Sequence, residues 1–295
     1  MKKIAFLGLG VMGYHIASHL LKSNKITIYN RTITKSQKFK KCYKNEQIII
    51  AKNPAEAVKD NEIILSCLGN DKDLKEVYFS NSGIYDSLLP NTYIIDHTTV
   101  SSKTAAYCFK KFANKKCFFL DAPVSGGEIG AINGSLSIMV GGKKETYKKS
   151  LDILNSLGEN VIYAGKLGMG QVFKMCNQIM VGSHIQAMCE AFALCKSKGG
   201  NLKLLKETLI GGSANSWMLQ NLGNDVIDKN EHAGFRIDLQ LKDLKLASEA
   251  AFESGVPLPG LSLVLALYLE ARAHNEGKNG NQSLFKTYDR MSNQK

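Results

Sequence analysis

Long apolar runs are missing from this 295-residue sequence, of which 44% is hydrophobic. No window approaches the roughly 18 uninterrupted apolar residues that a membrane span requires. The start at Lys2 and Lys3 leads within a few residues to a glycine loop and to no cleavage-type site, so it predicts a first strand and not a secretory signal. These absences predict a soluble, cytoplasmic protein with no membrane partner.

Paired cysteines are missing as well. The seven cysteines are an odd number, with no Cys-x-x-Cys pair and no neighbouring histidines at the spacing of a zinc site. We therefore expect reduced thiols and no metal. Cys67, Cys189 and Cys195 lie in apolar segments and are expected to act as small hydrophobic side chains.

Acidic residues are too few to balance the basic ones, 26 against 38, which leaves a formal charge of +12. Such an excess invites a nucleic-acid or anionic-membrane interpretation. However, the lysines are spread along the whole chain, and the densest run, residues 35–44, alternates with Phe39 and Cys42 as a surface helix would. A solvated basic surface is favoured, with no nucleic-acid partner, and its field would attract an anionic cofactor and substrate.

Strand and helix patterns alternate through the first half of the sequence. We expect strands at 3–7, 25–29, 48–51, 62–67, 93–96, 117–120, 137–140 and 160–163, and helices that include 11–21, 54–59 and 101–112. This alternation is typical of a parallel sheet with helices on both faces. After residue 168 strand signals nearly vanish, and helices are expected at 171–198, 202–210, 216–222, 239–254 and 261–274.

The predicted fold is therefore α/β. A Rossmann-type, doubly wound sheet forms a cofactor-binding domain of residues 1–164, and an all-α domain of residues 165–295 follows. The long helix at 171–198 is expected to join the two domains. No internal repeat and no low-complexity tract interrupts them.

A glycine-rich loop follows the first strand and opens the first helix, which is the context that the dinucleotide-binding pattern G-x-G-x-x-G requires. Gly8 would permit the tight turn, Gly10 would let the backbone approach the pyrophosphate, and Gly13 would allow close packing of helix and strand. The six residues of this expected cofactor loop are Gly8, Leu9, Gly10, Val11, Met12 and Gly13.

The end of the second strand bears on the choice of cofactor. An NAD site usually places an acidic residue there to accept hydrogen bonds from the ribose. Here the chain has Asn30, Arg31 and Thr32, which offer neutral or cationic donors to a 2′-phosphate. The sequence therefore favours NADP(H), with NAD(H) as the alternative if Arg31 only points into solvent.

The segment from Asp121 to Gly127 follows a strand at the carboxyl edge of the sheet, where ligands of open α/β folds bind. Ser125 offers its hydroxyl, and Gly126 and Gly127 leave backbone N–H groups open to approach by an anion. We expect this turn to hold the carboxylate of a small substrate. A purely structural turn is the alternative.

Lys174 lies in an apolar helical pattern, between Phe173 and Met175. A lysine in such surroundings is expected to be partly buried, where desolvation lowers its pKa toward the range of a general acid. Asn177 and Gln178 follow at i+3 and i+4 on the helix, so either amide could orient a substrate. A nicotinamide cofactor, a carboxylate turn and a lysine acid together indicate a 3-hydroxyacid dehydrogenase.

With these segments identified, the chain resembles the β-hydroxyacid dehydrogenase family over nearly its whole length. The matching motifs occur in the right order: Gly8–Gly13, Asp96–Thr99, Asp121–Gly127, the Lys174 segment, and Gly234–Leu239 with Lys242 and Asp243. The resemblance implies Lys174 as the catalytic residue, Thr99 and Lys242 near the nicotinamide, and a homodimer or homotetramer formed through the helical domain. Leu68 and Phe235 complete the expected cofactor contacts.

Two features leave the substrate open. Family members commonly have asparagine four residues after the lysine, whereas Gln178 stands there, preceded by Asn177, as in the tartronate semialdehyde reductase branch. Asn30, Arg31 and Thr32 instead look like the NADPH-using glyoxylate/succinic semialdehyde reductase branch. The sequence thus predicts hydride transfer between NADP(H) and a small 3-hydroxy acid or semialdehyde. The alternative from another class is a non-catalytic dinucleotide- or nucleic-acid-binding scaffold of the same fold.

Overall fold

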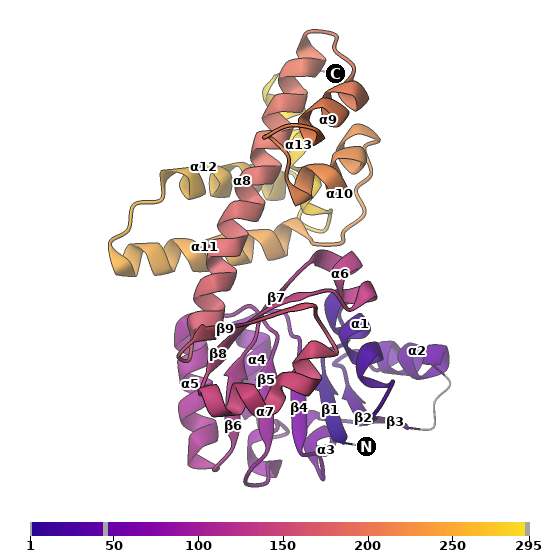
Figure 1. Cartoon of the computed structure of the whole chain (residues 1–295), viewed down its shortest axis with the longest axis vertical. Coiled ribbons are helices and arrows are strands. Elements are labelled where there is room, and N and C mark those ends of the chain that lie inside the picture. Colours follow the sequence, from indigo (N-terminus) through magenta and orange to yellow (C-terminus); the bar gives the residue numbers. More distant parts are fainter. Residues whose placement is uncertain (1, 44–46, 293–295) are drawn as a thin grey trace. The chain divides into compact units, whose positions relative to one another are not determined.

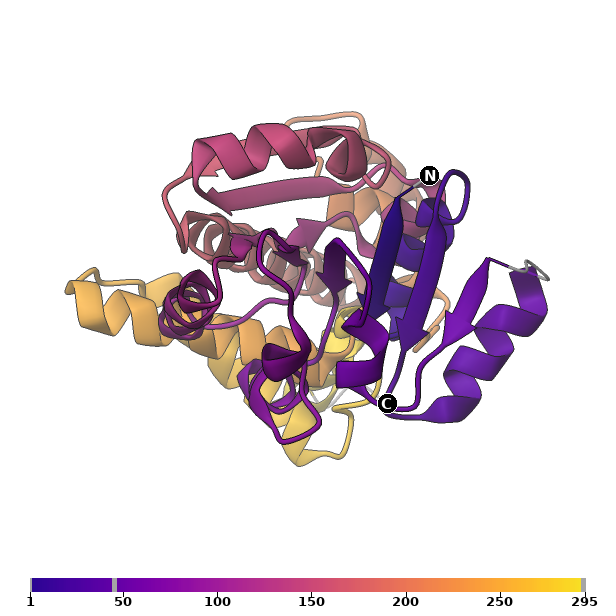
Figure 2. The ribbon, with the colours of Figure 1, turned by 90° about the horizontal axis from the view of Figure 1, so that it is seen from below.

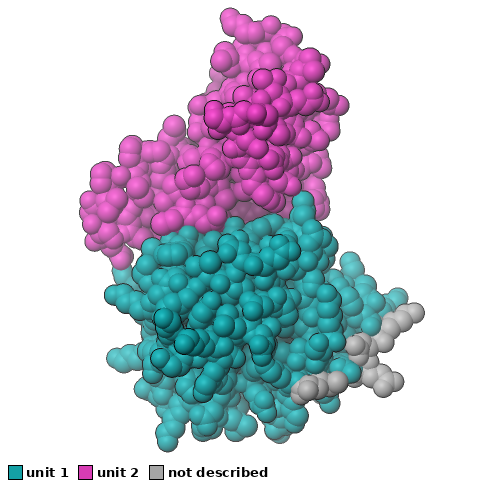
Figure 3. Space-filling model, in the orientation of Figure 1, with its two compact units in different colours: residues 1–174 teal, residues 175–295 magenta. Residues whose placement is uncertain are grey.

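The computed structural model describes residues 2–43 and 47–292, and the chain divides into two compact units, residues 1–174 and 175–295 (Figure 3). The boundary expected from sequence, after residue 164, coincides with the end of the last strand. The division lies after Lys174 instead, because the first turn of the long helix α8 (Met169–Ser197) is hydrogen-bonded to Asp121 of the sheet.

Unit 1 is built on one sheet whose parallel part has the strand order β3-β2-β1-β4-β5-β6 (Figure 1). Its order reverses between β1 and β4, so the carboxyl ends of these two strands flank the crevice where open α/β sheets bind ligands. These strands are β1 (Lys3–Leu7), β2 (Lys25–Tyr29), β3 (Ile48–Ile50), β4 (Ile63–Ser66), β5 (Tyr93–Asp96) and β6 (Phe118–Asp121).

Three further strands extend the sheet beyond β6. The strand β8 (Ser137–Gly142) is antiparallel to β6, the short β7 (Val124–Ser125) is antiparallel to β8, and β9 (Asn160–Gly165) runs parallel to β8. Because β6 and β7 both run antiparallel to β8, the chain keeps its direction from Asp121 into β7 and reverses only after Ser125. The turn that begins at Ser125 therefore stands where the chain changes direction.

Helices cover both faces of the sheet, as the view from below shows (Figure 2). Ile4 and Phe6 of β1 lie in one buried cluster, whereas Ala5 and Leu7 lie in another. The first cluster includes residues of α1 (Val11–Leu20), α2 (Ile33–Tyr43) and α7 (Lys144–Asn155), and the second includes residues of α3 (Pro54–Val58), α4 (Asp71–Phe79) and α5 (Ser102–Asn114). Apolar side chains on both faces of each strand are the mark of a buried parallel sheet, and the predicted doubly wound fold is confirmed.

The described part of unit 2 is helical, apart from one isolated bridge between Arg236 and Gly280. After α8 come α9 (Leu202–Ile210), α10 (Trp217–Ile227), α11 (Ile237–Ser254), α12 (Pro259–Ala273), η2 (Asn281–Leu284) and α13 (Phe285–Met291). The all-helical second half is confirmed. Among the described helices, none has the length and apolarity that crossing a bilayer would demand.

The elements that the sequence prediction did not include are mostly short or strongly polar on the surface. They are α4, β7, the 3₁₀ turn η1 (Tyr85–Ser87), α6 (Gly127–Asn133), α7, η2 and α13.

The seven cysteines are free thiols. Among the three that were expected to act as small hydrophobic side chains, Cys189 is buried, and Cys67 and Cys195 are partly buried.

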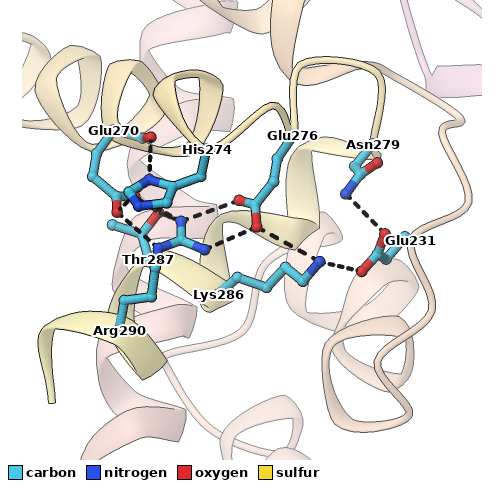
Figure 4. Close-up of polar contacts among 8 residues, drawn as sticks. All are labelled: Glu231, Glu270, His274, Glu276, Asn279, Lys286, Thr287 and Arg290. Atoms are coloured by element: carbon cyan, nitrogen blue, oxygen red, sulfur yellow. Dashed lines mark hydrogen bonds and ion pairs between the residues drawn. The ribbon is translucent and has the colours of Figure 1, made fainter. Parts of the chain in front are cut away.

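A polar network fastens the last helix, α13, to the rest of unit 2 (Figure 4). The guanidinium of Arg290 donates from Nε and Nη2 to the two carboxylate oxygens of Glu270 on α12, both at 2.8 Å, and from Nη1 to Glu276 at 2.8 Å. Lys286 forms ion pairs with Glu276 and with Glu231. The hydrogen bonds from Arg290 hold the pKa of Glu270 below its ordinary value.

We expect Arg290→Ala to lower the free energy of unfolding at pH 7 by roughly 1–3 kcal/mol, because it leaves the half-buried carboxylate of Glu270 and the buried carboxylate of Glu276 without their shared partner. A carboxyl group whose pKa is lowered in the folded state stabilises the fold above its unfolded pKa and loses that contribution as the pH falls through the folded value. The deficit of the variant should therefore shrink in acid. Urea unfolding at pH 7 and below pH 4 measures both effects.

Arg272→Ala, on α12, is the matched control because the Arg272 side chain is exposed. Equal deficits in the two variants, or a deficit for Arg290→Ala that does not change with pH, would show that the network does not stabilise α13.

Candidate active site

The loop between β1 and α1 has the geometry of a phosphate cradle. Gly8 has φ of +101°, and a Cβ atom there would collide with the carbonyl oxygen of Cys67; a Cβ atom at Gly13 would collide with the carbonyl oxygen of Gly8. By contrast, no described atom outside the neighbouring residues lies within 4 Å of a Cβ placed on Gly10, the residue that begins α1 without a side-chain cap. The first and third glycines close the turn, and the second leaves an open approach to the helix N-terminus, a favourable place for an anion.

The end of β2 is tied to this loop. The side-chain carbonyl of Asn30 accepts a hydrogen bond from the backbone N–H of Leu9 at 2.9 Å, and its amide donates to the backbone carbonyl of Thr32 at 3.0 Å. The side chain of Asn30 therefore bonds to the main chain at both Leu9 and Thr32. Its contact with a 2′-phosphate stays a prediction.

The guanidinium of Arg31 forms an ion pair with Asp73, on the first turn of α4, at 2.9 Å, and 73% of the Arg31 side chain is exposed. An anion that approaches Arg31 therefore competes with a carboxylate. Sequence analysis missed Asp73. The available signal was the spacing from Asn70, whose side chain caps α4 by accepting from the backbone N–H of Asp73 at 2.9 Å.

The loop after β5 joins the same edge of the sheet. The backbone N–H of Leu68 donates to the hydroxyl of Thr98 at 2.9 Å, and that hydroxyl donates to Oδ1 of Asp96 at 2.6 Å. Leu68 also lies beside Gly8, since its Cδ2 atom would be 2.9 Å from a Cβ atom on that glycine. The half-buried Thr99 follows Thr98. The structure thus brings Leu68 and the Thr98–Thr99 loop beside the glycine loop.

Buried ionisable groups line this edge. Burial raises the pKa of Asp96 to about 7, although hydrogen bonds from Thr98 and Ser66 act in the opposite direction. Burial lowers the pKa of His97 to about 4, and its ring is bonded through Nδ1 to the carbonyl of Ala122 at 2.7 Å. His97 is therefore neutral at pH 7 and links the ends of β5 and β6.

The expected carboxylate turn lies between β7 and α6. Ser125 ends β7 and is half-buried, and the two glycines that follow have φ of +135° and +63°. Side chains are strained at such angles, so Gly126 and Gly127 meet a conformational requirement of the turn. The turn follows β6 by only a few residues, at the carboxyl edge of the sheet.

Lys174 belongs to unit 1 and is buried, with 6% of its surface exposed. It lies on α8, less than one turn after Gln171. The main chain at the start of α8 donates to Asp121 at the end of β6, and the side chain of Gln171 bonds to Thr98 and Val100 in the loop after β5. The helix that carries Lys174 therefore starts from the same sheet edge that holds the glycine loop and the Ser125 turn.

The remaining predicted site residues belong to unit 2. The buried amide of Gln178 donates to Oδ2 of Asp243 at 2.7 Å, and Lys242 lies 3.0 Å from Oδ1 of the same carboxylate. Asn177 and Phe235 are half-buried. Gln178 thus has a partner on α11 that sequence analysis noted only as part of a motif.

Two family models together match almost the whole chain. Residues 3–165 match the NAD binding domain of 6-phosphogluconate dehydrogenase, and residues 168–288 match the family described as NAD-binding of NADP-dependent 3-hydroxyisobutyrate dehydrogenase.

Curated relatives are similar over most or nearly all of their length. The chain is 36% identical to the uncharacterized oxidoreductase YkwC of Bacillus subtilis, over 97% of this chain and 99% of that protein. It is 33% identical to the probable 3-hydroxyisobutyrate dehydrogenase-like 1, mitochondrial, of Arabidopsis thaliana, over 99% of this chain and 86% of the relative. It is 31% identical to the NAD-dependent L-serine dehydrogenase of Pseudomonas aeruginosa, over 91% of each chain.

The crystal structure of 3-hydroxyisobutyrate dehydrogenase from Salmonella typhimurium has the same fold, with a TM-score of 0.89 at 24% identity over 97% of this chain and 99% of that one. Together with the glycine loop and the buried lysine, these matches show that the chain belongs to the β-hydroxyacid dehydrogenase family, whose members are oxidoreductases with a nicotinamide dinucleotide as cofactor.

Proposed function

We propose that this protein transfers hydride between NADP(H) and a small 3-hydroxy acid or its semialdehyde, with Lys174 as the proton donor. The observation that carries the proposal is the burial of Lys174 on a helix whose first turn is bonded to the ends of β5 and β6. A proton donor for a carbonyl needs this kind of fixed, buried position.

Lys174 and the glycine loop of unit 1 have separate roles in this reaction. The bound nicotinamide dinucleotide supplies the hydride for reduction or accepts it in oxidation. Lys174 Nζ donates a proton to the carbonyl oxygen of the semialdehyde as hydride reaches the carbonyl carbon, and it takes the hydroxyl proton back in the reverse direction. The Gly8–Gly13 loop holds the pyrophosphate through backbone N–H groups and the start of α1.

The substrate carboxylate is assigned to Ser125, Gly126 and Gly127. The positive φ angles of the two glycines support this role, because residues without a side chain adopt them readily and leave the main chain of the turn open to an anion. We extend the proposal to Asn177 and Gln178 as substrate contacts, and to Thr99, Phe235 and Lys242 as cofactor contacts, on the basis of the family motifs. A panel of glyoxylate, tartronate, methylmalonate and succinic semialdehydes, each with NADPH and NADH, tests the activity and selects the substrate.

The alternative of a non-catalytic scaffold is not favoured, because the curated relatives with a stated activity are named as dehydrogenases. Self-association through the helical unit and a cytoplasmic location remain part of the proposal. Exposed apolar side chains in unit 2, among them Met180, Leu194 and Leu263, support the first.

We expect Lys174→Ala to lower kcat by on the order of 100-fold or more while the dissociation constant of the cofactor changes little, because only proton transfer is removed. Steady-state kinetics and fluorescence titration with NADPH measure the two quantities. Lys166→Ala, an exposed lysine just before α8, is the control and should retain full activity. Near-normal turnover of Lys174→Ala would end the assignment.

The turn at Ser125 predicts a strong preference for anionic substrates. An aldehyde without the carboxylate should have a kcat/KM at least about 10-fold lower than the corresponding acid, since the donors of the turn would be left unpaired. Ser125→Ala should reduce that preference, whereas Ser135→Ala should not. Equal kcat/KM values for the acid and for its uncharged analogue would show that the turn does not bind the substrate carboxylate.

Cofactor preference follows from the charges around Arg31. A charge-assisted hydrogen bond from Arg31 to the 2′-phosphate is worth about 1–3 kcal/mol, so kcat/KM should be roughly 5- to 150-fold higher for NADPH than for NADH. Asp73→Asn should raise this ratio further, because it removes the carboxylate that now holds the guanidinium. The double variant Asn30→Asp with Arg31→Ala should reverse the preference.

Asp86→Asn serves as the control for these measurements, because Asp86 is a largely exposed carboxylate of unit 1 outside the proposed site. A wild-type ratio at or below one would show that Arg31 does not bind a phosphate. An unchanged ratio in Asp73→Asn would show that the ion pair with Arg31 has no bearing on cofactor choice.

A further inference from the structure

The carboxylate of Asp121 is fully buried at the end of β6, and each of its oxygens serves the start of α8. Its Oδ1 accepts from the backbone N–H of Gly168 at 2.8 Å, and its Oδ2 accepts from the backbone N–H of Gln171 at 3.0 Å. The N–H groups of a first helical turn have no partner inside the helix, so they need an acceptor from elsewhere. Here that acceptor comes from a strand far away in the sequence.

Glycines keep the space around this carboxylate clear. A Cβ atom on Gly141 of β8 would lie 2.5 Å from Oδ1 of Asp121, and a Cβ atom on Gly170 of α8 would lie 2.7 Å from Oδ2. Neither position tolerates a side chain while Asp121 keeps its place. The first turn of α8 is therefore seated directly against the strand end.

Gln171 adds a second attachment, to the loop after β5. Its Oε1 accepts from the backbone N–H of Val100 at 3.1 Å, and its Nε2 donates to the carbonyl of Thr98 at 2.9 Å. The Thr98 hydroxyl is itself bonded to Asp96, the neighbour of Asp121 in the sheet register. The start of α8 is thus held from two adjacent strands, and Lys174 follows Gln171 at i+3, on the same side of the helix.

We propose that Asp121 and Gln171 are positioning residues, which hold the first turn of α8 so that the amine of Lys174 meets the reacting carbonyl oxygen. This inference rests on the proposed role of Lys174. It assigns a role to the first residue of the segment 121–127, in which only Ser125, Gly126 and Gly127 were expected to act. Because proton transfer tolerates little displacement, loosening this turn should slow the reaction without preventing substrate binding.

The ionised form of Asp121 comes at a cost in stability, which argues against a purely structural role. Burial raises its pKa from 3.8 to about 6, so its contribution to stability is largest below pH 3.8 and is lost as the pH rises through 6. Of the titratable groups beside it, Asp96 on β5 has the same sign of charge and His97 is neutral at pH 7. On β8 and on the first turn of α8, glycines and main-chain atoms face it.

The test uses Asp121→Asn and Gln171→Ala in the full-length protein. Asparagine keeps one acceptor oxygen but turns an N–H group toward a second backbone N–H, and alanine removes both side-chain bonds of Gln171. Each variant should lose about 10- to 100-fold in kcat while KM changes by less than about 3-fold. Gln171→Glu, which keeps the acceptor for Val100, should recover part of the loss. Asp152→Asn, whose carboxylate on α7 is 90% exposed, is the control.

A double-mutant cycle separates positioning from a general structural effect. If Asp121 and Gln171 act through Lys174, then adding either substitution to Lys174→Ala should lower kcat by less than about 2-fold beyond Lys174→Ala alone. Additive losses, or near-normal kcat in both single variants, would overturn the inference. If Asp121→Asn does not fold, the kcat values of the two Gln171 variants test the inference, because these variants leave the main-chain bonds to Asp121 in place. Near-normal turnover of Lys174→Ala would instead refute the proposed function.

Discussion

The hydrogen bonds between the carboxylate of Asp121 and the main chain of α8 are the interaction on which the rest of the site depends. They fix where the long helix begins, and they fix it against the buried end of a strand. Without them the first turn of α8 would have buried N–H groups with no acceptor, because the helix itself offers none to its first turn. Such groups would destabilise the folded state. Lys174 follows this attachment by less than one helical turn, the loop after β5 is bonded to Gln171 of the same turn, and the turn at Ser125 follows Asp121 in the chain.

At the carboxyl edge of the sheet, the main chain and the side chains have different structural roles. Glycines at positions 8, 13, 126 and 127 provide turns that other residues would strain or block, and Gly10 leaves open backbone. Buried polar side chains such as Asp96, Thr98 and Gln171 bond to loops and so hold these turns in place. The groups that would meet a ligand are therefore mainly backbone N–H groups and one amine, fixed by side chains behind them.

The region after β2 differs, because its charges lie near the surface. The Arg31 side chain, 73% exposed, is paired with that of Asp73 on α4, 24% exposed, and an ion pair so near the surface contributes little to stability. In the proposed function this pair discriminates between ligands that differ by one phosphate. The names of relatives point both ways, to NADP for the family matched by residues 168–288 and to NAD for the serine dehydrogenase. The proposed preference of this chain for NADP(H) therefore rests on these local charges, because relatives with both kinds of name belong to the same family.

Local patterns in the sequence determined the doubly wound sheet, the glycine loop, the helical second half and the family, because each depends on residues that are neighbours in the chain. The same patterns pointed to Lys174 and to the Ser125 turn as candidates. They could not reveal that Asn30 bonds to the backbone of Leu9, that Asp73 faces Arg31, or that Gln178 is held by Asp243. Nor could they show that Asp121 caps α8. Each of these contacts joins residues more than twenty positions apart, and only the packing of strands and helices determines which distant polar groups meet.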